Sequence, residues 1–395
     1  MSADGRPEYD FDHHRTGFQH ELAATYARLR AECPIAHTPA HGGFWIVARY
    51  EDVAAVARDQ ERFSSACSVV VPAADVGFLP PLETDSPALD RYRRMLSPFL
   101  APGAARELTA IIERAAIQAL DPVLERGHGE LVAEFANPVP ARTTMVLLGL
   151  EPDDWWFFAQ PLHDASYAVP GSPEFIDAIK RIAAFGGRIE QEVDARIAQP
   201  RDDMISRLLT DETDGAPATR DEVVGLARMV IFGGMDTVMA AMSHAVLRLG
   251  RDIGLQRLLR REPSSIPIAV EEILRLDAPI QGFARTTTRD CEVASHPLPA
   301  GELVFILWAS ANRDDQVFAE PEAFRLDRVP NRHLTFGIGP HFCQGAALAR
   351  TEMRVMLEAL LSRLPEFRVV EEDVVAPPTI GIANGFVAVP VVLDA

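Results

Sequence analysis

The sequence has few cysteines, and none of them lies at a paired spacing. Its 395 residues include four cysteines, Cys33, Cys67, Cys291 and Cys343. This excludes a disulfide-stabilised secreted scaffold and favours a reducing, cytoplasmic location. We expect ordinary structural roles for the first three cysteines. The surroundings of Cys343 indicate a different role.

Long apolar runs and an excess of basic residues are also missing. No uninterrupted apolar run reaches the roughly eighteen residues of a membrane span, and residues 1–15 are too polar for a signal peptide. With 38 Lys and Arg against 57 Asp and Glu, the net charge of −19 argues against a nucleic-acid partner. There is no internal repeat and no G-x-G-x-x-G after a strand, so no nucleotide cofactor site is predicted.

The hydrophobic periodicity predicts one mainly helical domain over residues 1–395 with a minor β part, and residues 1–19 as a flexible arm. Residues 64–84, rich in Pro and Gly, are expected to form a long functional loop. An Asn384-Gly385 turn predicts a C-terminal hairpin. Strands are expected at 43–48, 283–287 and 303–307, and helices at 20–33, 50–63, 87–98, 103–126, 138–149, 151–168, 173–198, 202–210, 219–250, 255–261, 265–276 and 345–363.

Residues 336–345, Phe-Gly-Ile-Gly-Pro-His-Phe-Cys-Gln-Gly, place a single cysteine in a Gly-rich loop before a predicted helix. The N–H groups and dipole of that helix favour a thiolate at Cys343. A lone thiolate cannot complete a zinc or iron–sulfur site, which needs about four protein ligands. It can be the axial ligand of a haem, whose other ligands come from the porphyrin.

A second unusual stretch lies inside the predicted helix at 219–250. Thr219 and Glu222 form a capping box, and an apolar run follows. Gly233-Gly234 then interrupts it, although each Gly destabilises a helix by about 1 kcal/mol relative to Ala. Asp236 and Thr237 place polar groups where a core helix should have none. Such local conflicts tend to mark functional sites.

Both stretches resemble signatures of the cytochrome P450 family. Residues 336–345 match Phe-Gly-x-Gly-x-His-x-Cys-x-Gly at every fixed position, and residues 233–237 resemble (Ala/Gly)-Gly-x-(Asp/Glu)-Thr. The resemblance runs from about residue 20 to the C-terminus. It implies a P450-like fold, a single large helical domain with small β-sheets, and haem b between the long central helix and the cysteine loop. It further implies that Cys343 binds the iron, Thr237 hydrogen-bonds bound dioxygen, Asp236 delivers protons, and Phe336, Gly337, Gly345 and Gly233 form the haem site.

The resemblance also implies contacts to the haem propionates and a structural triad. Arg285, His341 and Arg93 stand at positions of propionate ligands, whereas Leu89 replaces a histidine that the family usually has. The Glu-x-x-Arg motif and the Pro-Glu-x-Phe region imply a buried, non-catalytic triad of Glu272, Arg275 and Arg328.

By the same resemblance, the substrate pocket is mainly apolar, which predicts a small hydrophobic substrate such as a terpenoid, fatty, aromatic or polyketide-like molecule. The expected contacts come from residues 68–80, 160–175 and three other segments. The pocket residues are Val69, Val70, Met229, Phe232, Phe283, Ile382 and Ala383. The expected reaction is hydroxylation or epoxidation.

Electrons from NAD(P)H are expected to arrive through a separate ferredoxin and ferredoxin reductase, because no reductase is expected in this chain. Basic residues beside the cysteine loop could form the docking patch; they are Arg93, Arg94, Arg332, Arg350 and Arg354. A monomer is expected.

Three alternatives remain open. A haem-thiolate peroxygenase would use hydrogen peroxide directly, although peroxide users in the family tend to lack the acid–alcohol pair. Oxidative coupling or desaturation would leave no added oxygen in the product. A haem sensor or ligand-binding protein would need no proton relay, so Asp236 and Thr237 argue against it.

Overall fold

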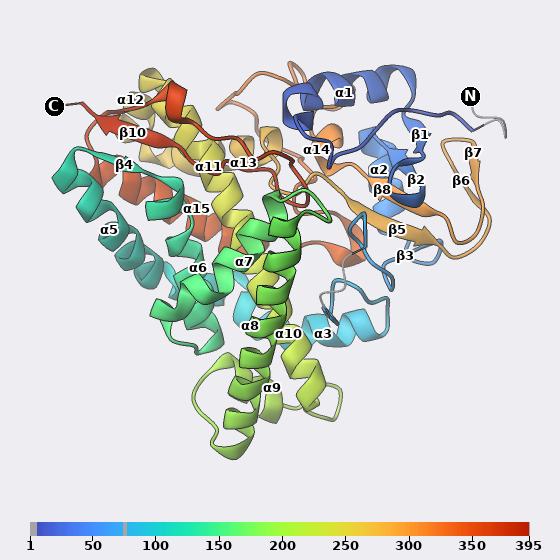
Figure 1. The fold of residues 1–395 in the computed structure, drawn as a ribbon, viewed down its shortest axis with the longest axis horizontal. Coiled ribbons are helices and arrows are strands. Elements are labelled where there is room, and N and C mark those ends of the chain that lie inside the picture. The colour runs from blue at the N-terminus through green and yellow to red at the C-terminus, as the bar shows by residue number, and fades with distance from the viewer. Residues whose placement is uncertain (1–5, 74–76, 395) are drawn as a thin grey trace.

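A computed structural model describes residues 6–73 and 77–394, and Figure 1 shows how its elements are arranged. Helices make up most of the molecule, and a five-stranded sheet lies towards the side where the N-terminus is found. The mainly helical architecture with small β-sheets that the sequence predicts is confirmed.

The helices follow the apolar periodicity closely. Their bounds are α1 Phe18–Glu32, α2 Tyr50–Arg58, α3 Ala88–Leu100, α4 Pro102–Glu107, α5 Thr109–Arg126, α6 Pro138–Leu148, α7 Trp155–Tyr167, α8 Pro173–Ala198, α9 Met204–Thr210, α10 Arg220–Gly234, α11 Asp236–Arg251, α12 Ile253–Arg261, α13 Ile266–Leu276, α14 Trp308–Ala311 and α15 Ala346–Arg363.

The strands are short, at two to five residues each. They are β1 Ile35–Thr38, β2 Phe44–Val47, β3 Phe63–Ser64, β4 His128–Glu130, β5 Phe283–Thr287, β6 Cys291–Val293, β7 His296–Leu298, β8 Leu303–Ile306, β9 Phe367–Val369 and β10 Pro390–Leu393. The largest sheet has the order β1-β2-β8-β5-β3, with β2 and β8 parallel and the other pairs antiparallel. Strands β4, β10 and β9 form a second sheet, and β6 and β7 form a third.

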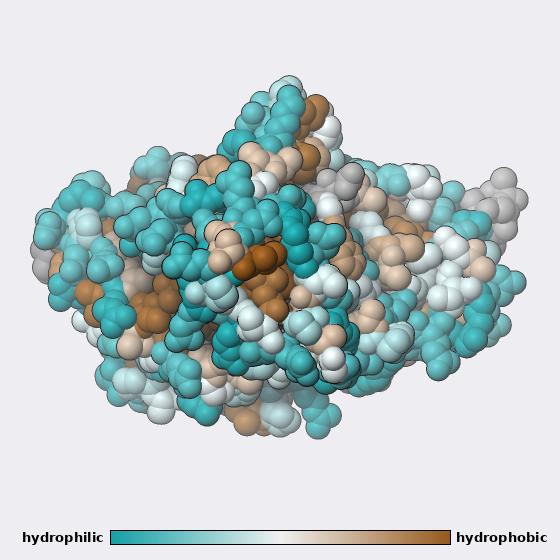
Figure 2. All heavy atoms as spheres, turned by 90° about the horizontal axis from the view of Figure 1, so that it is seen from below, coloured by the Kyte–Doolittle hydropathy of each residue, from teal (hydrophilic) through white to brown (hydrophobic). Residues whose placement is uncertain are grey.

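The core divides according to these elements. One large apolar cluster joins side chains of α3 to α13 and α15, and two smaller clusters pack on the five-stranded sheet. Figure 2 shows one face of the molecule, on which hydrophilic residues predominate and hydrophobic residues form small separate patches. That face agrees with the solvated surface expected from the composition.

The central helix is split into α10 and α11, which meet at Met235. The predicted capping box is confirmed: Thr219 Oγ1 accepts from Glu222 N, and Glu222 Oε2 accepts from Thr219 N. By length and composition alone, the segment from Arg220 to Arg251 could cross a membrane, but 61% of its most apolar window is buried inside the protein. Such burial is typical of a core helix.

Residues 6–17 do not form the flexible arm that the sequence predicts for residues 1–19. Phe11 and Phe18 are fully buried in the cluster below β1 and β2, and Thr379 Oγ1 donates a hydrogen bond to His13 O over 3.2 Å. The segment is mostly polar, so its composition did not indicate that Phe11 would be buried and hold it in place. Residues 1–5 lie outside the described residues.

The predicted hairpin at Asn384-Gly385 is also wrong. Asn384 N donates to Pro279 O over 2.7 Å instead of closing a two-residue turn. A Cβ at Gly385 would lie 2.4 Å from Tyr167 Oη and 2.8 Å from Ala240 Cα. This glycine therefore allows the chain to approach α7 and α11 closely.

Candidate active site

The loop before α15 holds Cys343 through backbone hydrogen bonds. Cys343 N donates to Phe336 O over 2.7 Å, and Gly337 N donates to Leu334 O over 2.8 Å. Gly337 has a φ of 69°, a conformation that favours glycine. The loop therefore folds back on itself and leads directly into α15, which begins at Ala346 as predicted.

Cys343 is an exposed residue of the loop, although its thiol is surrounded by protein. Burial raises its pKa, and the N–H groups of Gly345 and Ala346 and the charges of Arg93 and Arg350 lower it only in part. The net effect is opposite to the thiolate preference expected from the helix N-terminus alone. A bound metal cation would reverse this effect, because it deprotonates a coordinating thiol.

The two glycines of the central helix have different roles. A Cβ at Gly233 would meet only the Met229 methyl group, at 3.4 Å, and Gly233 is exposed. A Cβ at Gly234 would lie 2.6 Å from Thr144 Oγ1 on α6. At Gly233 the exposed face of the helix therefore carries no side chain, whereas the missing Cβ at Gly234 allows α6 to pack closely.

Asp236 and Thr237 begin α11, just after the break. The Thr237 hydroxyl donates to Gly233 O over 2.8 Å, so its lone pairs remain free to accept a hydrogen bond. The Asp236 side chain is buried and lies 3.4 Å from the ring of His163 on α7, measured from Oδ1 to Nδ1. The structure therefore directs the carboxylate towards α7.

Three basic side chains gather near the cysteine loop. Arg285 is buried and donates to Ala284 O over 2.7 Å, and Arg93 donates to Phe342 O over 2.8 Å. Among the described residues neither guanidinium forms an ion pair with a carboxylate, although the charge of Asp85 acts on Arg285. Burial lowers the pKa of Arg285 to about 10, and burial with the charges of Arg285 and Arg93 lowers that of His341 to about 4.

This basic group is suited to an anion. Within residues 6–73 and 77–394, the buried His341 Nε2 has no hydrogen-bond partner, and uncompensated buried cations are costly. Leu89, at the position of the missing histidine, is fully buried in α3 and offers no polar contact. Arg285, Arg93 and His341 are therefore the groups that could bind carboxylates between β5 and the cysteine loop.

The structure brings Glu272, Arg275 and Arg328 together. Glu272 Oε1 accepts from Arg275 Nη2 over 2.8 Å and from Arg328 Nε over 3.1 Å, and both members of the Glu272–Arg275 pair are fully buried. Asn331 Nδ2 also donates to Glu272 Oε2 over 3.0 Å. Arg275 further binds backbone carbonyls, including Asn312 O, so the group anchors α13 to the segment before the cysteine loop.

The residues expected to form the substrate pocket differ in burial. Val69 and Ala383 are buried, whereas Ile382 is 36% exposed. Val69 O accepts from Ala284 N over 2.7 Å, so this part of the 64–84 loop is bound to β5. The half-buried residues of the set are Val70, Met229, Phe232 and Phe283. Residues 74–76 of the expected segment 68–80 lie outside the described residues.

Comparison with known proteins decides the family. The family model for cytochrome P450 matches residues 266–391. Cytochrome P450 130 of Mycobacterium tuberculosis is 33% identical, covering 89% of this chain and 90% of that protein. The chain belongs to the cytochrome P450 family. The steroid C26-monooxygenase of M. tuberculosis is 33% identical over 94% of each chain. A cytochrome P450 of Mycobacterium marinum in complex with pseudoionone superposes with a TM-score of 0.88 at 28% identity, covering 99% of this chain and 100% of that one.

This P450 is a monooxygenase of the oxidoreductase class. Its residues fit a thiolate-bound haem: Cys343 is a free cysteine on an exposed loop, a Cβ at Gly233 would meet only Met229, and His341 has a buried nitrogen that is unpartnered among the described residues. Bound there, the haem would supply the redox chemistry of dioxygen activation. Among the described residues, no group of three or more His, Cys, Asp or Glu could hold a metal ion.

Sequence reasoning assigned residues 160–175 to substrate contact but did not single out His163 and Tyr167 or predict that His163 lies beside Asp236. His163 lies among apolar residues of α7, and Tyr167 follows one turn later. A histidine on an apolar helix face is a weak signal, and no sequence pattern connects residue 163 with residue 236. Only the packing of α7 against α11 reveals the contact.

Proposed function

We propose that this P450 hydroxylates or epoxidises a small hydrophobic molecule, using dioxygen and electrons from a separate ferredoxin. The observation that carries the proposal is the combination of a free cysteine, Cys343, with an acid–alcohol pair at the break of the central helix. Cys343 binds the haem iron in this proposal, and Arg285, Arg93 and His341 bind the propionates. We also propose that residues 1–395 form a single domain acting as a monomer in the cytoplasm.

The roles of Thr237 and Asp236 follow from their contacts. Because the Thr237 hydroxyl donates to Gly233 O, it is oriented to accept a hydrogen bond from a protonated oxygen species. Asp236 supplies protons in this proposal, since none of the described residues bonds to its Oδ2. General acid catalysis of this kind typically contributes about 10²–10⁴-fold to a rate.

The substrate class rests on the apolar side chains assigned to the pocket and on relatives named for a steroid and for pseudoionone. An apolar pocket selects by shape and burial. Half-buried Val70, Met229, Phe232 and Phe283 have unused apolar surface for such a molecule.

Ferredoxin docking would use exposed Arg332, which has no carboxylate partner among the described residues. Arg93 also lacks one there, but in this proposal it binds a haem propionate. The other three are neutralised: Arg94 pairs with Asp214, Arg350 with Glu271 and Arg354 with Glu358. The patch is therefore smaller than the sequence indicates.

The carbon monoxide complex of the reduced protein tests the proposal. We expect the long-wavelength Soret band of thiolate-bound haem, which Cys343→Ser should abolish while haem is retained. Cys67→Ser, at an exposed cysteine, is the matched control and should keep the band. A haem-loaded wild type without this band would contradict the proposal. Turnover with peroxide as fast as with ferredoxin would favour a peroxygenase.

A further inference from the structure

Ser65 carries a buried hydroxyl that has not been used in the account so far. The residue is only 1% exposed, and its Oγ has no hydrogen-bond partner among residues 6–73 and 77–394. A serine hydroxyl can both donate and accept a hydrogen bond, and leaving it unpaired in a protein interior is costly. Buried polar groups normally have partners, so this exception indicates a partner that binds separately from the chain.

The sheet places this serine beside the strand that carries Arg285. Ser65 follows β3, which pairs antiparallel with β5, and Ser64 of β3 lies opposite Thr286. One step further along the two chains, in opposite directions, Ser65 comes beside Arg285. The unpaired hydroxyl and the buried guanidinium therefore lie at the same end of this strand pair.

Asp85 connects Ser65 to the basic groups near the cysteine loop. Its Oδ1 accepts from Ser65 N over 2.9 Å, and its Oδ2 accepts from Ser64 Oγ. Burial lowers the pKa of Arg285 and of His341, and the charge of Asp85 acts against that effect on both groups. Because Asp85 takes the N–H of one serine and the hydroxyl of the other, the Ser65 hydroxyl is the donor that remains.

The start of α3 lacks a donor on the face that meets the cysteine loop. Leu89 and Arg93 are four residues apart and share one face of α3, and Arg93 Nη1 donates to Phe342 O over 2.8 Å. Leu89 is fully buried and cannot donate to a carboxylate from its side chain. Its N–H donates to Asp85 O over 3.0 Å. Asp85 thus holds the Ser65 hydroxyl at the end of α3 where this face is apolar.

We propose that Ser65 donates a hydrogen bond from its hydroxyl to a haem propionate, beside Arg285 and at the apolar end of the α3 face. The hydroxyl adds no charge, and a hydrogen bond to an ionised acceptor is stronger than one between neutral groups. The proposal rests on the proposed function, because it assumes that Arg285, Arg93 and His341 bind the propionates. It explains why a buried serine has no partner within the chain.

The first test observes the propionates directly. In resonance Raman spectra of the ferric holoenzyme, the propionate bending band moves to lower frequency when a hydrogen bond to the carboxylate is lost. We expect this shift in Ser65→Ala but not in Ser65→Thr, which keeps the hydroxyl. A band of Ser65→Ala at the wild-type frequency would overturn the proposal.

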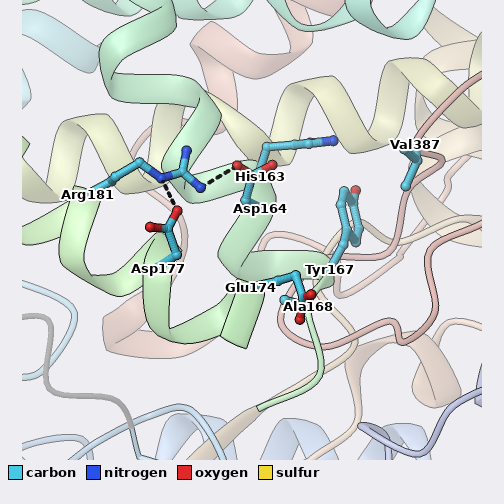
Figure 3. A pocket seen from close by; sticks show the side chains of 8 residues that line it. All are labelled: His163, Asp164, Tyr167, Ala168, Glu174, Asp177, Arg181 and Val387. Carbon is cyan, nitrogen blue, oxygen red and sulfur yellow. Dashed lines mark hydrogen bonds and ion pairs between the residues drawn. The ribbon is translucent and has the colours of Figure 1, made fainter. Parts of the chain in front are cut away.

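Tyr167→Phe is the matched control for removing a buried hydroxyl. Tyr167 Oη is also buried and has no partner among the described residues. It lies elsewhere, on α7 beside a cavity of about 380 Å³ that α7, α8 and Val387 line (Figure 3). We therefore expect Tyr167→Phe to leave the propionate band unchanged, and a shift as large as that of Ser65→Ala would count against a specific contact at Ser65.

The second test measures haem retention. Transfer of haem from the holoenzyme to an excess of apomyoglobin, followed by the Soret absorbance, gives the rate of haem release. We expect Ser65→Ala to release haem about tenfold faster, because a hydrogen bond to a charged group is lost. Ser65→Thr and Tyr167→Phe should release haem at close to the wild-type rate.

The outcomes separate this proposal from the proposed function. If the carbon monoxide complex of the wild type lacks the band of thiolate-bound haem, the proposed function fails. If the wild type has that band and Ser65→Ala keeps both the propionate frequency and the release rate, only the present proposal is overturned. Faster release without a frequency shift would give Ser65 a packing role and would also overturn it. Should the added methyl group prevent Ser65→Thr from folding, the comparison of Ser65→Ala with Tyr167→Phe decides.

Discussion

At the scale of single residues, the acid and the alcohol at the helix break face different partners. Thr237 bonds back to Gly233 on the preceding turn, whereas Asp236 faces His163 on α7. Their adjacency in sequence suggested a single relay. The structure instead separates a hydroxyl at Thr237, which faces back to Gly233, from a buried carboxylate at Asp236 that faces α7, so substitutions at the two positions should differ in effect.

We expect Thr237→Ala to leave substrate binding nearly unchanged and to divert most electrons into hydrogen peroxide. The lost hydroxyl can no longer accept from a protonated oxygen species, whereas the apolar pocket is unaffected. The measurements are the Soret shift on titration with a ligand and the ratio of peroxide to NADPH consumed. Thr237→Ser, which retains the hydroxyl, is the control; equal peroxide ratios in all three proteins would contradict the assigned role.

Glu271 provides a pH-dependent prediction. Burial raises its pKa, but hydrogen bonds from His333 and Arg350 lower it more, to about 2 from an ordinary 4.5. A lowered folded-state pKa contributes stability that is fully present above pH 4.5 and is lost as the pH falls from there towards 2.

We therefore expect Glu271→Gln to lower the thermal midpoint at neutral pH, with the difference from wild type shrinking as the pH falls through 4.5. Thermal unfolding of the holoenzyme at a series of pH values measures this. Glu358→Gln removes a comparable but more exposed pair with Arg354, and should cost less at neutral pH. A difference at Glu271 that stays constant down to pH 3 would contradict the assignment.

At the scale of elements, periodicity and capping predicted the helices well, because α10 and α15 begin where their sequences provide the signals. The motifs located the cysteine loop and the break at Met235 in the same way. What sequence could not supply were contacts between distant segments. Polar residues 6–17 are anchored by Phe11, and His163 meets Asp236 only because α7 crosses α11.

The Asn384-Gly385 pair shows the same limit. The Asn-Gly sequence is typical of a hairpin turn, because glycine readily adopts positive φ angles. Here glycine is needed for a different reason: the backbone at Gly385 lies too close to Tyr167 and Ala240 for a side chain. Local chemistry alone does not distinguish the two uses.

Two glycines test this interpretation. We expect Gly385→Ala to destabilise the protein by about 1–3 kcal/mol, because the new Cβ would overlap Tyr167 and Ala240. Gly187→Ala, within α8 and with nothing within 4 Å of the added Cβ, should instead stabilise it by about 0.5–1 kcal/mol. Thermal midpoints of the two variants and the wild type measure both effects. Equal shifts would show that Gly385 is not a contact position.

At the scale of the whole molecule, a net charge of −19 must be reconciled with the proposed docking of a small acidic ferredoxin. Long-range repulsion between two acidic proteins is opposed only by a local patch of unpaired cations. Of the five arginines near the cysteine loop, three are neutralised by carboxylates, which leaves Arg93 and Arg332. Because Arg93 also contacts the cysteine loop, Arg332 is the position that tests docking without disturbing the haem site.

We expect Arg332→Glu to slow reduction by ferredoxin at about 0.05 M ionic strength, and the difference from wild type to shrink towards about 0.3 M as salt screens the charges. Stopped-flow measurement of ferredoxin-driven reduction, followed by the carbon monoxide complex, gives the rate. Arg261→Glu changes the net charge equally but lies at the end of α12, on the opposite side of the molecule from α3 in Figure 1, and should show only the small effect of added net charge. If both variants slow reduction equally, net charge governs the encounter and the docking patch must be abandoned.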